Sequence, residues 1–336
     1  MFNSQSDSET CYWYRENDNW QYGASNILHT GYAIQVEALT CTYKNKVAVD
    51  HLSLHVPTGS VYGFLGPNGA GKTTTIKTLL GLRPLQSGTV TVLGSDLSRQ
   101  GLEYRQRIGY MPETSNLYGH MTVYQLIETA RRLSTRWNNR AVLRYLDLFN
   151  LPLKEKVRKL SKGMKGQLAL TIALGSEPDL LILDEPTSGL DPLKRYEFLN
   201  HIVREVSSAG RTIFFSSHNL SEVEQIADTV AIINEGRLVI EDNLDDLKAR
   251  EKAVKVGFDQ PVWVHDLENI PGVRQVLQEG RRFRLLVRGN AEDVAAELRG
   301  YGARSVEVVD MNLEAIFIAY LQGYREFSDY IQEVKA

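Results

Sequence analysis

Apolar and polar residues form three patterns along this chain: uninterrupted apolar runs, strict alternation and helical spacing. Uninterrupted apolar runs, as at 180–183, predict strands that are covered on both faces, as in a parallel sheet. Strict alternation, as at 52–56 and 90–92, predicts half-buried strands, which we expect in an antiparallel layer beside the parallel core. Apolar residues at helical spacing fill much of 121–159 and predict a helical insert. The fold class that follows is α/β with a mixed sheet.

The same pattern divides the chain into three parts. Residues 1–32 are polar apart from a few aromatics, and we expect a flexible extension, with an interaction arm as the alternative. Residues 33–249 carry the α/β pattern, with a helical subdomain at about 114–165. Residues 250–336 combine alternating strands with a helix capped by Asn290, which predicts a small α+β domain. A basic stripe in it is expected on a solvated strand face rather than at a nucleic-acid site: Arg281, Arg282, Arg284 and Arg288.

Composition changes this picture little. The 336 residues are 43% hydrophobic and 24% charged, which is ordinary for one large or two smaller globular domains. The formal net charge of -3 creates no global field for nucleic acid, so no nucleic-acid partner is expected. Two cysteines, Cys11 and Cys41, are too few for a disulfide framework and favour a reducing compartment. No apolar run approaches the ~20 residues that cross a bilayer, and no secretory signal is seen, so any link to a membrane is expected through a partner.

The first candidate for chemistry follows the short apolar strand at 61–65. Residues 66–73 match G-x-x-x-x-G-K-[ST], the P-loop pattern, at every fixed position, and a helical pattern comes next. The glycines permit a tight turn and close approach to a phosphate, while the N–H groups at the helix start attract an anion. Lys72 supplies positive charge for the outer phosphates, and Thr73 supplies a hydroxyl for Mg²⁺. The alternative is a glycine turn before an ordinary helix, which the strand–loop–helix order disfavours.

Two carboxylates follow the apolar run at 180–183. Acids at the carboxyl end of a parallel strand lie in the crevice where ligands bind. Asp184 is expected to hold Mg²⁺, and Glu185 to orient or deprotonate a water molecule. The alternative is a strand that ends in two solvated acids, and the P-loop upstream argues against it.

Three further candidates are single residues. Tyr43 ends the first strand, where it could stack on a purine, although on this residue alone an ordinary surface or core tyrosine is the better explanation. Ser161 is a predicted N-cap, and the helix that it starts is a second site for an anion. His218 follows the apolar strand at 212–216, from which it could reach a γ-phosphate, whereas most lone histidines are structural.

Together these motifs resemble the ATP-binding subunit of an ABC transporter, over about 34–249. The P-loop, the signature segment at 160–164 and the acids at 184–185 occur in the order of that family. The resemblance implies a P-loop NTPase fold of the ABC ATPase type that uses ATP and Mg²⁺. It implies ATP binding by Tyr43, Gly66, Pro67, Asn68, Gly69, Ala70, Gly71, Lys72, Thr73 and Thr74. It further implies catalysis by Glu185 and His218, Mg²⁺ at Thr73, Glu113 and Asp184, signature residues Ser161, Lys162, Gly163 and Met164 acting in trans, and Asp191 in a dimer loop.

Two departures from the family pattern are informative. The signature is usually Leu-Ser-Gly-Gly-Gln, and here Lys162 and Met164 replace its first glycine and its glutamine. The loop after Pro112 usually carries glutamine, and here it carries Glu113, which keeps an oxygen for Mg²⁺ or water but adds a charge. Both resemble variants of export ATPases, including those of antibiotic-resistance and multidrug efflux systems. The C-terminal region resembles the accessory domain of the same exporters.

The resemblance also implies how the protein works. Two ATPase subunits, identical or different, stack head to tail, and each ATP lies between one P-loop and the signature of the other subunit. Separate transmembrane permease subunits are the other partners, which places the chain at the cytoplasmic face of the cell membrane. Closure on ATP would pull the permease, and hydrolysis would release it. The transported substrate is chosen by the permease.

Three other functions compete with an export ATPase. A soluble ABC ATPase that acts on ribosomes usually carries two ATPase halves, and this chain has one. A chromosome-maintenance ATPase has a long coiled coil between P-loop and signature, which this chain lacks. A non-catalytic regulator would not need the intact Lys72, Asp184, Glu185 and His218. Import is harder to separate from export.

Overall fold

The computed structural model describes residues 31–43, 46–99, 102–114, 116–207 and 210–321. The polar extension expected at 1–32, and Cys11 with it, lie almost wholly outside the described residues. Cys41 is buried and free. Among the helices that the structure describes, none combines the length and the apolar character needed to cross a bilayer.

The central sheet is parallel except at one edge, as the uninterrupted apolar runs predict. Its six strands are ordered β10-β9-β3-β8-β7-β6, and β10 alone runs antiparallel to its neighbour. Every residue of β3 and β7 is buried, because strands and helices cover both faces. The strands are β3 (Val61–Leu65), β6 (Ile108–Met111), β7 (Leu180–Asp184), β8 (Thr212–Ser217), β9 (Thr229–Asn234) and β10 (Arg237–Asn243).

An antiparallel sheet lies beside this core, also as predicted. Its order is β2-β1-β4-β5, with β1 at Tyr32–Tyr43, β2 at Lys46–Pro57, β4 at Ser87–Val92 and β5 at Ser95–Asp96. Helix α1 (Lys72–Leu79) packs between the two sheets, and its Ile76 and Leu79 share one buried cluster with Leu52 and Phe214. The P-loop is thereby held between two rigid layers.

The helices after β6 form the expected insert. They are α2 (Val123–Leu133), α3 (Asn139–Leu148) and α4 (Lys162–Gly175), with a short 3-10 turn at Val157–Lys159. A second 3-10 turn, Leu102–Arg107, precedes β6. Thr122 and Gln125 form a capping box that fixes the start of α2. A small apolar cluster of the insert's own includes Val123, Ile127 and Leu168. Helices α5 (Pro192–Ser207) and α6 (Leu220–Ile226) follow β7 and β8.

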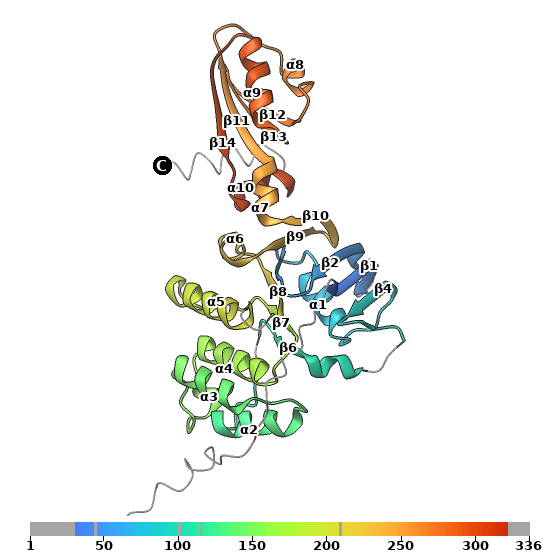
Figure 1. The fold of residues 1–336 in the computed structure, drawn as a ribbon, viewed down its shortest axis with the longest axis vertical. Coiled ribbons are helices and arrows are strands. Elements are labelled where there is room, and N and C mark those ends of the chain that lie inside the picture. Colours follow the sequence, from blue (N-terminus) through green and yellow to red (C-terminus); the bar gives the residue numbers. More distant parts are fainter. Residues whose placement is uncertain (1–30, 44–45, 100–101, 115, 208–209, 322–336) are drawn as a thin grey trace, which may run out of the picture.

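The C-terminal region contains a third sheet at the end of the molecule opposite to α2 and α3 (Figure 1). Its order is β12-β13-β11-β14, and α8 and α9 cover one face over a core that includes Val254 and Leu285. On the other face, Ala253 and Leu286 join α10 and the central sheet in one continuous apolar cluster. The elements are α7 (Leu244–Arg250), β11 (Glu251–Phe258), α8 (Val264–Glu268), β12 (Val273–Glu279), β13 (Arg282–Arg288), α9 (Ala291–Gly300), β14 (Ala303–Asp310) and α10 (Leu313–Leu321).

One expectation for this sheet is wrong. Arg284 does not lie on a solvated strand face, because its side chain is only 9% exposed. Strand β13 is an inner strand, so Arg284 has Leu277 of β12 on one side and Lys255 of β11 on the other. Arg281, Arg282 and Arg288 are exposed, as expected.

Candidate functional site

The loop between β3 and α1 has the backbone of an anion site. Gly66 is buried, and a Cβ there would lie 2.4 Å from the carbonyl oxygen of Ile233, so a side chain does not fit. Gly71, which precedes α1, has φ of 112°, a left-handed conformation that glycine adopts without strain. The first turn of α1 carries no acidic residue, so its unpaired N–H groups and the helix dipole favour a phosphate.

Lys72 begins α1 and turns back over this loop. Its side chain is buried, and its Nζ donates to the carbonyl oxygens of Gly66 at 2.6 Å and Pro67 at 3.3 Å. The same Nζ lies 3.3 Å from Oε1 of Glu185. Buried carbonyl and carboxylate oxygens therefore hold the ammonium group where the outer phosphates are expected.

Glu185 links the P-loop to the strand β8. Its second oxygen, Oε2, lies 2.7 Å from Nδ1 of His218, whose side chain is 56% exposed. Glu185 has φ of 49°, a left-handed conformation that is strained for a residue other than glycine. Its backbone N–H donates to the carbonyl oxygen and the hydroxyl of Ser216, and these bonds hold the strained residue in place.

Asp184 ends β7 next to the P-loop and is 1% exposed. Its Oδ1 accepts hydrogen bonds from Ser216 Oγ at 2.7 Å and from Thr73 Oγ1 at 3.3 Å. Asp184, Thr73 and Glu113 line one cavity of about 510 Å³. Burial, with a smaller effect of Asp184, raises the pKa of Tyr110 in the same wall to about 12, so this phenol stays neutral.

These residues fit Mg²⁺ in the way that ATP-dependent proteins use it. Magnesium takes one or two protein oxygens and completes its shell with phosphate and water. Thr73 and Asp184 offer a hydroxyl and a carboxylate within hydrogen-bonding distance. Among the described residues, no group of three His, Cys, Asp or Glu side chains forms a metal site of its own.

Tyr43 lies at the end of β1 and is 52% exposed. The guanidinium of Arg83 sits 4.9 Å from the centre of its ring, a cation–π contact. An adenine base would have to take the other face of the ring or displace Arg83. The role of Tyr43 in base stacking stays a prediction.

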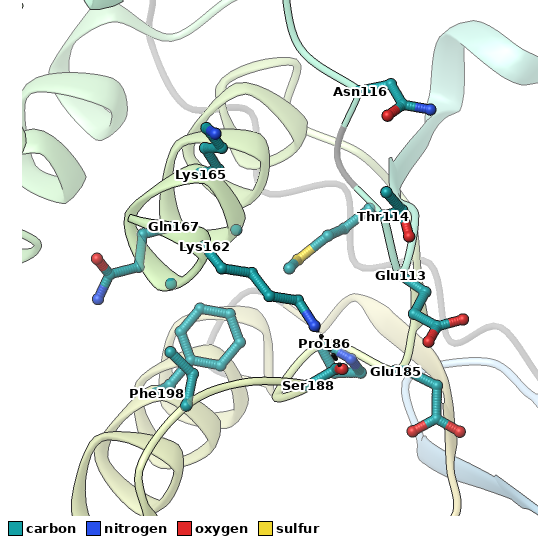
Figure 2. A pocket seen from close by; sticks show the side chains of 14 residues that line it. Glu113, Thr114, Asn116, Lys162, Lys165, Gln167, Glu185, Pro186, Ser188 and Phe198 are labelled. Atoms are coloured by element: carbon teal, nitrogen blue, oxygen red, sulfur yellow. Dashed lines mark hydrogen bonds between the residues drawn. The ribbon is translucent and has the colours of Figure 1, made fainter. Parts of the chain in front are cut away.

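The signature residues start α4, and they contact the loop after the acids in the same chain. Ser161 caps the helix, accepting a hydrogen bond from the N–H of Met164 at 3.2 Å. Lys162 crosses a cavity of about 300 Å³ to donate to Ser188 Oγ at 3.1 Å (Figure 2). A Cβ on Gly163 would lie 2.8 Å from Leu190 Cδ2, so a side chain at this position would require Leu190 to shift.

The same cavity is bounded by Glu113 and Glu185 on one side and by α4 on the other (Figure 2). Asp191 points elsewhere: its carboxylate accepts from the N–H of Lys194 and caps α5. This hydrogen bond is the largest cause that lowers the pKa of Asp191. The expected role of Asp191 in a dimer loop stays a prediction.

Sequence reasoning missed two buried polar groups near the acids. Ser216 bonds both Asp184 and Glu185, and its only signal is a serine directly after the apolar residues of β8. Glu222 is buried and accepts from Thr187 Oγ1 at 2.8 Å and Ser217 Oγ at 3.1 Å. Burial raises the pKa of Glu222 above its usual value. A glutamate in the first turn of α6 gave no signal of that burial.

A P-loop between two sheets, with a buried lysine and two acids at the carboxyl end of the parallel strand β7, defines a P-loop nucleotide-binding protein. The family model described as ABC transporter matches residues 49–188. The chain belongs to the ATP-binding proteins of ABC transporters, because two relatives within that family exceed 30% identity over most of their length.

One relative is the uncharacterized ABC transporter ATP-binding protein YcbN of Bacillus subtilis, 39% identical over 65% of this chain and 72% of the relative. Another is the bacitracin transport ATP-binding protein BcrA of Bacillus licheniformis, 41% identical over 65% of this chain and 72% of the relative. A solved ATP-binding subunit of an ABC transporter superposes with a TM-score of 0.59 at 30% identity, covering 65% of this chain and 92% of that structure. These likenesses confirm both the predicted fold class and the resemblance.

Proposed function

We propose that this chain binds and hydrolyses ATP to power export through separate transmembrane permease subunits. One observation carries the proposal: Lys72, Glu185 and His218 form a continuous chain of contacts of 3.3 Å or less at the P-loop. A structural role alone does not require a buried lysine, a strained acid and a histidine at one point. The bacitracin transport relative supports export of an antibiotic-like substrate, which the permease would select.

Each residue of the nucleotide site has a separate role in this proposal. The N–H groups of the P-loop and Lys72 bind the phosphates, and Tyr43 stacks on the base. Thr73 and Asp184, with Glu113 nearby, would hold Mg²⁺, and the ion would neutralise phosphate charge. Phosphate oxygens would draw Lys72 away from Glu185, and the freed carboxylate oxygen could then accept a proton from water. His218 orients Glu185 through the 2.7 Å contact.

We infer that two such subunits, identical or different, close head to tail over ATP. Ser161 and Lys162 are exposed at the start of α4, whose first turn carries no acidic residue. That helix start is suited to the γ-phosphate of an ATP bound to the other subunit. Closure would require Lys162 to give up its hydrogen bond to Ser188 and to contact that phosphate instead.

We also propose a place for the permease. The cavity of about 510 Å³ that Thr73 and Asp184 line also has Leu82, Leu117 and Ile172 in its wall. These apolar side chains are suited to contact a cytoplasmic helix of a membrane subunit. The chain would then work at the cytoplasmic face of the membrane, with no nucleic acid. A soluble ABC ATPase acting on ribosomes is not favoured, because the chain carries one ATPase half.

The proposed organisation has three parts. Residues 33–249 form the ATPase domain, with a helical subdomain at about 114–165, and residues 250–336 form the accessory α+β domain. Residues 1–32 carry none of the nucleotide motifs and are expected to be dispensable for catalysis. ATPase activity of a chain that starts at Ala33 tests this, and loss of activity in a folded truncation would contradict it.

Glu185→Gln tests the mechanism as a whole. Glutamine keeps the shape and cannot accept the proton, so hydrolysis should fall roughly 10²- to 10⁴-fold while MgATP still binds. The variant should accumulate as an ATP-bound dimer in sedimentation, alone or with the co-purified permease. Ser161→Arg, added to Glu185→Gln, should block that dimer by filling the second phosphate site. A monomer in both settings, or hydrolysis at the parent rate, would defeat the proposal.

A further inference from the structure

The C-terminal sheet carries a groove on the face that α8 and α9 leave uncovered. Its volume is about 310 Å³, and it is lined by the second half of β11 and by the first halves of β13 and β14. Its floor is the inner strand β11, where Gly257 has no side chain; a Cβ there would lie 2.9 Å from Ser305 Oγ. The polar residues that line the groove are Lys255, Arg282, Arg284, Ser305 and Glu307.

Arg284 is buried in this groove without a counterion. It is 9% exposed, and neither Nε nor Nη1 has a hydrogen-bond partner. Other arginines with a buried unbonded nitrogen, Arg105, Arg195 and Arg250, each make a hydrogen bond or an ion pair elsewhere. Arg284 differs from these three arginines, because within the described part of the chain it makes neither a hydrogen bond nor an ion pair.

A buried guanidinium without a partner is unfavourable, because its lost hydration is not replaced. Glu307, the acid that lines the groove, is not a counterion of Arg284. Glu307 is 67% exposed and lies 3.5 Å from Lys255, toward the other side of β11. With Lys255, Arg282 and Arg284 against Glu307, the groove has three positive charges and one negative, a net of about two positive.

The chemistry of these groups selects the ligand. A guanidinium presents parallel N–H donors that match two oxygens of a phosphate, and an ammonium adds a point charge. A phosphate monoester carries nearly two negative charges at neutral pH, which balances the groove. The volume is at the lower end of the range for small-molecule sites, so it suits a compact ligand.

We propose that this groove binds the phosphate group of a small soluble molecule, with Arg284 as the central donor. The guanidinium of Arg284 donates to the phosphate oxygens, Lys255 adds charge from the neighbouring strand β11, and Arg282 adds charge from two residues earlier on β13. The site is separate from the P-loop, because all of its residues belong to the C-terminal sheet. A phospholipid headgroup offers the same chemistry, and the experiment separates the two sources.

The test uses the full chain labelled with ¹⁵N-arginine, with saturating MgADP so that the P-loop is not open to phosphate. The Nε–H signal of Arg284 is assigned by its loss in Arg284→Met. Inorganic phosphate should shift this signal saturably, and calorimetry should give a matching affinity. Arg284→Lys, which keeps the charge but loses the fork, should bind roughly ten- to a hundredfold more weakly. Arg281→Met removes an exposed neighbouring charge outside the groove and should bind as the parent does.

Two results would overturn the proposal. One is no saturable shift of the Arg284 signal with phosphate. The other is a phosphate affinity that Arg284→Met leaves unchanged. Sedimentation with phosphatidic acid vesicles, against phosphatidylcholine vesicles, tests the source: binding to the former that Arg284→Met abolishes would replace the soluble ligand with a lipid. Circular dichroism of each variant checks that the sheet is intact.

Discussion

The buried charges at the P-loop have protein partners, whereas the buried charge of Arg284 in the C-terminal sheet has none among the described residues. At the P-loop, Lys72 contacts two carbonyl oxygens and Glu185, and Asp184 accepts from Ser216 and Thr73. In the C-terminal sheet, Arg284 is equally inaccessible and has no protein partner among the described residues. The two regions therefore bury charge for different reasons.

This contrast distinguishes a site whose polar groups are already hydrogen-bonded from a site that lacks hydrogen-bond partners until a ligand binds. Polar groups that bond to each other hold their positions before any ligand arrives, which is what catalysis requires. A buried charge without a partner instead lowers stability until something supplies the missing hydrogen bonds. Removing a partner group at the P-loop should therefore lower the free energy of unfolding, whereas removing Arg284 should leave it unchanged or raise it.

The largest effect is expected from Lys72→Ala. The ammonium group makes charge-assisted hydrogen bonds to phosphate, each worth roughly 1.5–3 kcal/mol, so MgATP affinity should fall by at least about tenfold per bond lost. Isothermal titration calorimetry measures it. Lys154→Ala, at an exposed lysine in the helical insert, serves as the control. Equal MgATP affinity in Lys72→Ala and the parent would remove the P-loop assignment.

Ser216→Ala should have the next largest effect. It leaves the buried carboxylate of Asp184 and the N–H of Glu185 each with one bond fewer. We expect the free energy of unfolding to fall by about 1–3 kcal/mol and the rate of ATP hydrolysis to fall with it. Urea denaturation measures the first and a phosphate-release assay the second. Ser221→Ala, at an exposed serine, should change the free energy of unfolding by less than about 0.5 kcal/mol.

Arg284→Met sharpens the comparison because, unlike Ser216→Ala, it should not lower the free energy of unfolding. Methionine fills much of the same space and removes an unpaired buried charge. In phosphate-free buffer the free energy of unfolding should stay the same or rise by up to about 1 kcal/mol. Chemical denaturation checks this prediction. A loss above about 2 kcal/mol would mean that Arg284 has a structural partner and that the two regions do not differ.

The smallest effect concerns a cluster of three charged residues on the surface of α2. Arg131 and Arg132 hold the pKa of Glu128 at about 2, below its ordinary value of 4.5. Its folded pKa is the lower one, so its contribution is present above pH 4.5 and is lost as the pH falls toward 2. Glu128→Gln should lower the free energy of unfolding at pH 7 by less than about 1 kcal/mol, because water screens the cluster. Thermal unfolding at pH 7 and pH 3 should show the difference shrinking with acid; a constant difference would contradict it.

Much of the fold was predictable because its signals are local. An apolar run such as 180–183 identifies a buried strand without reference to its neighbours, and the glycines of 66–73 are dictated by their own backbone. The helix cap at Ser161 is likewise set within three residues. Fold class and P-loop follow from such features.

The missed features depend on neighbours that are distant in sequence. Ser216 matters because β8 pairs with β7 and brings it to Asp184. Lys162 donates to Ser188, which is 26 positions later in the sequence, and hydrophobic periodicity does not predict such a contact. Alternation in β13 correctly puts Arg284 opposite the α9 core, but only the strand order shows that the residue is enclosed.

The apolar cluster that runs from the central sheet through α10 into the C-terminal sheet has a mechanical consequence. Leu183, Leu247, Ala253, Leu286 and Ile316 belong to it, so the distal sheet is fused to the ATPase half rather than hinged on it. We expect the sheet to travel with that half as a lever arm, which would turn a small closure at the nucleotide into a wider sweep at its far end. Spin labels at position 299, on the exposed side of α9, would register this sweep between two subunits as a change in distance on adding ATP.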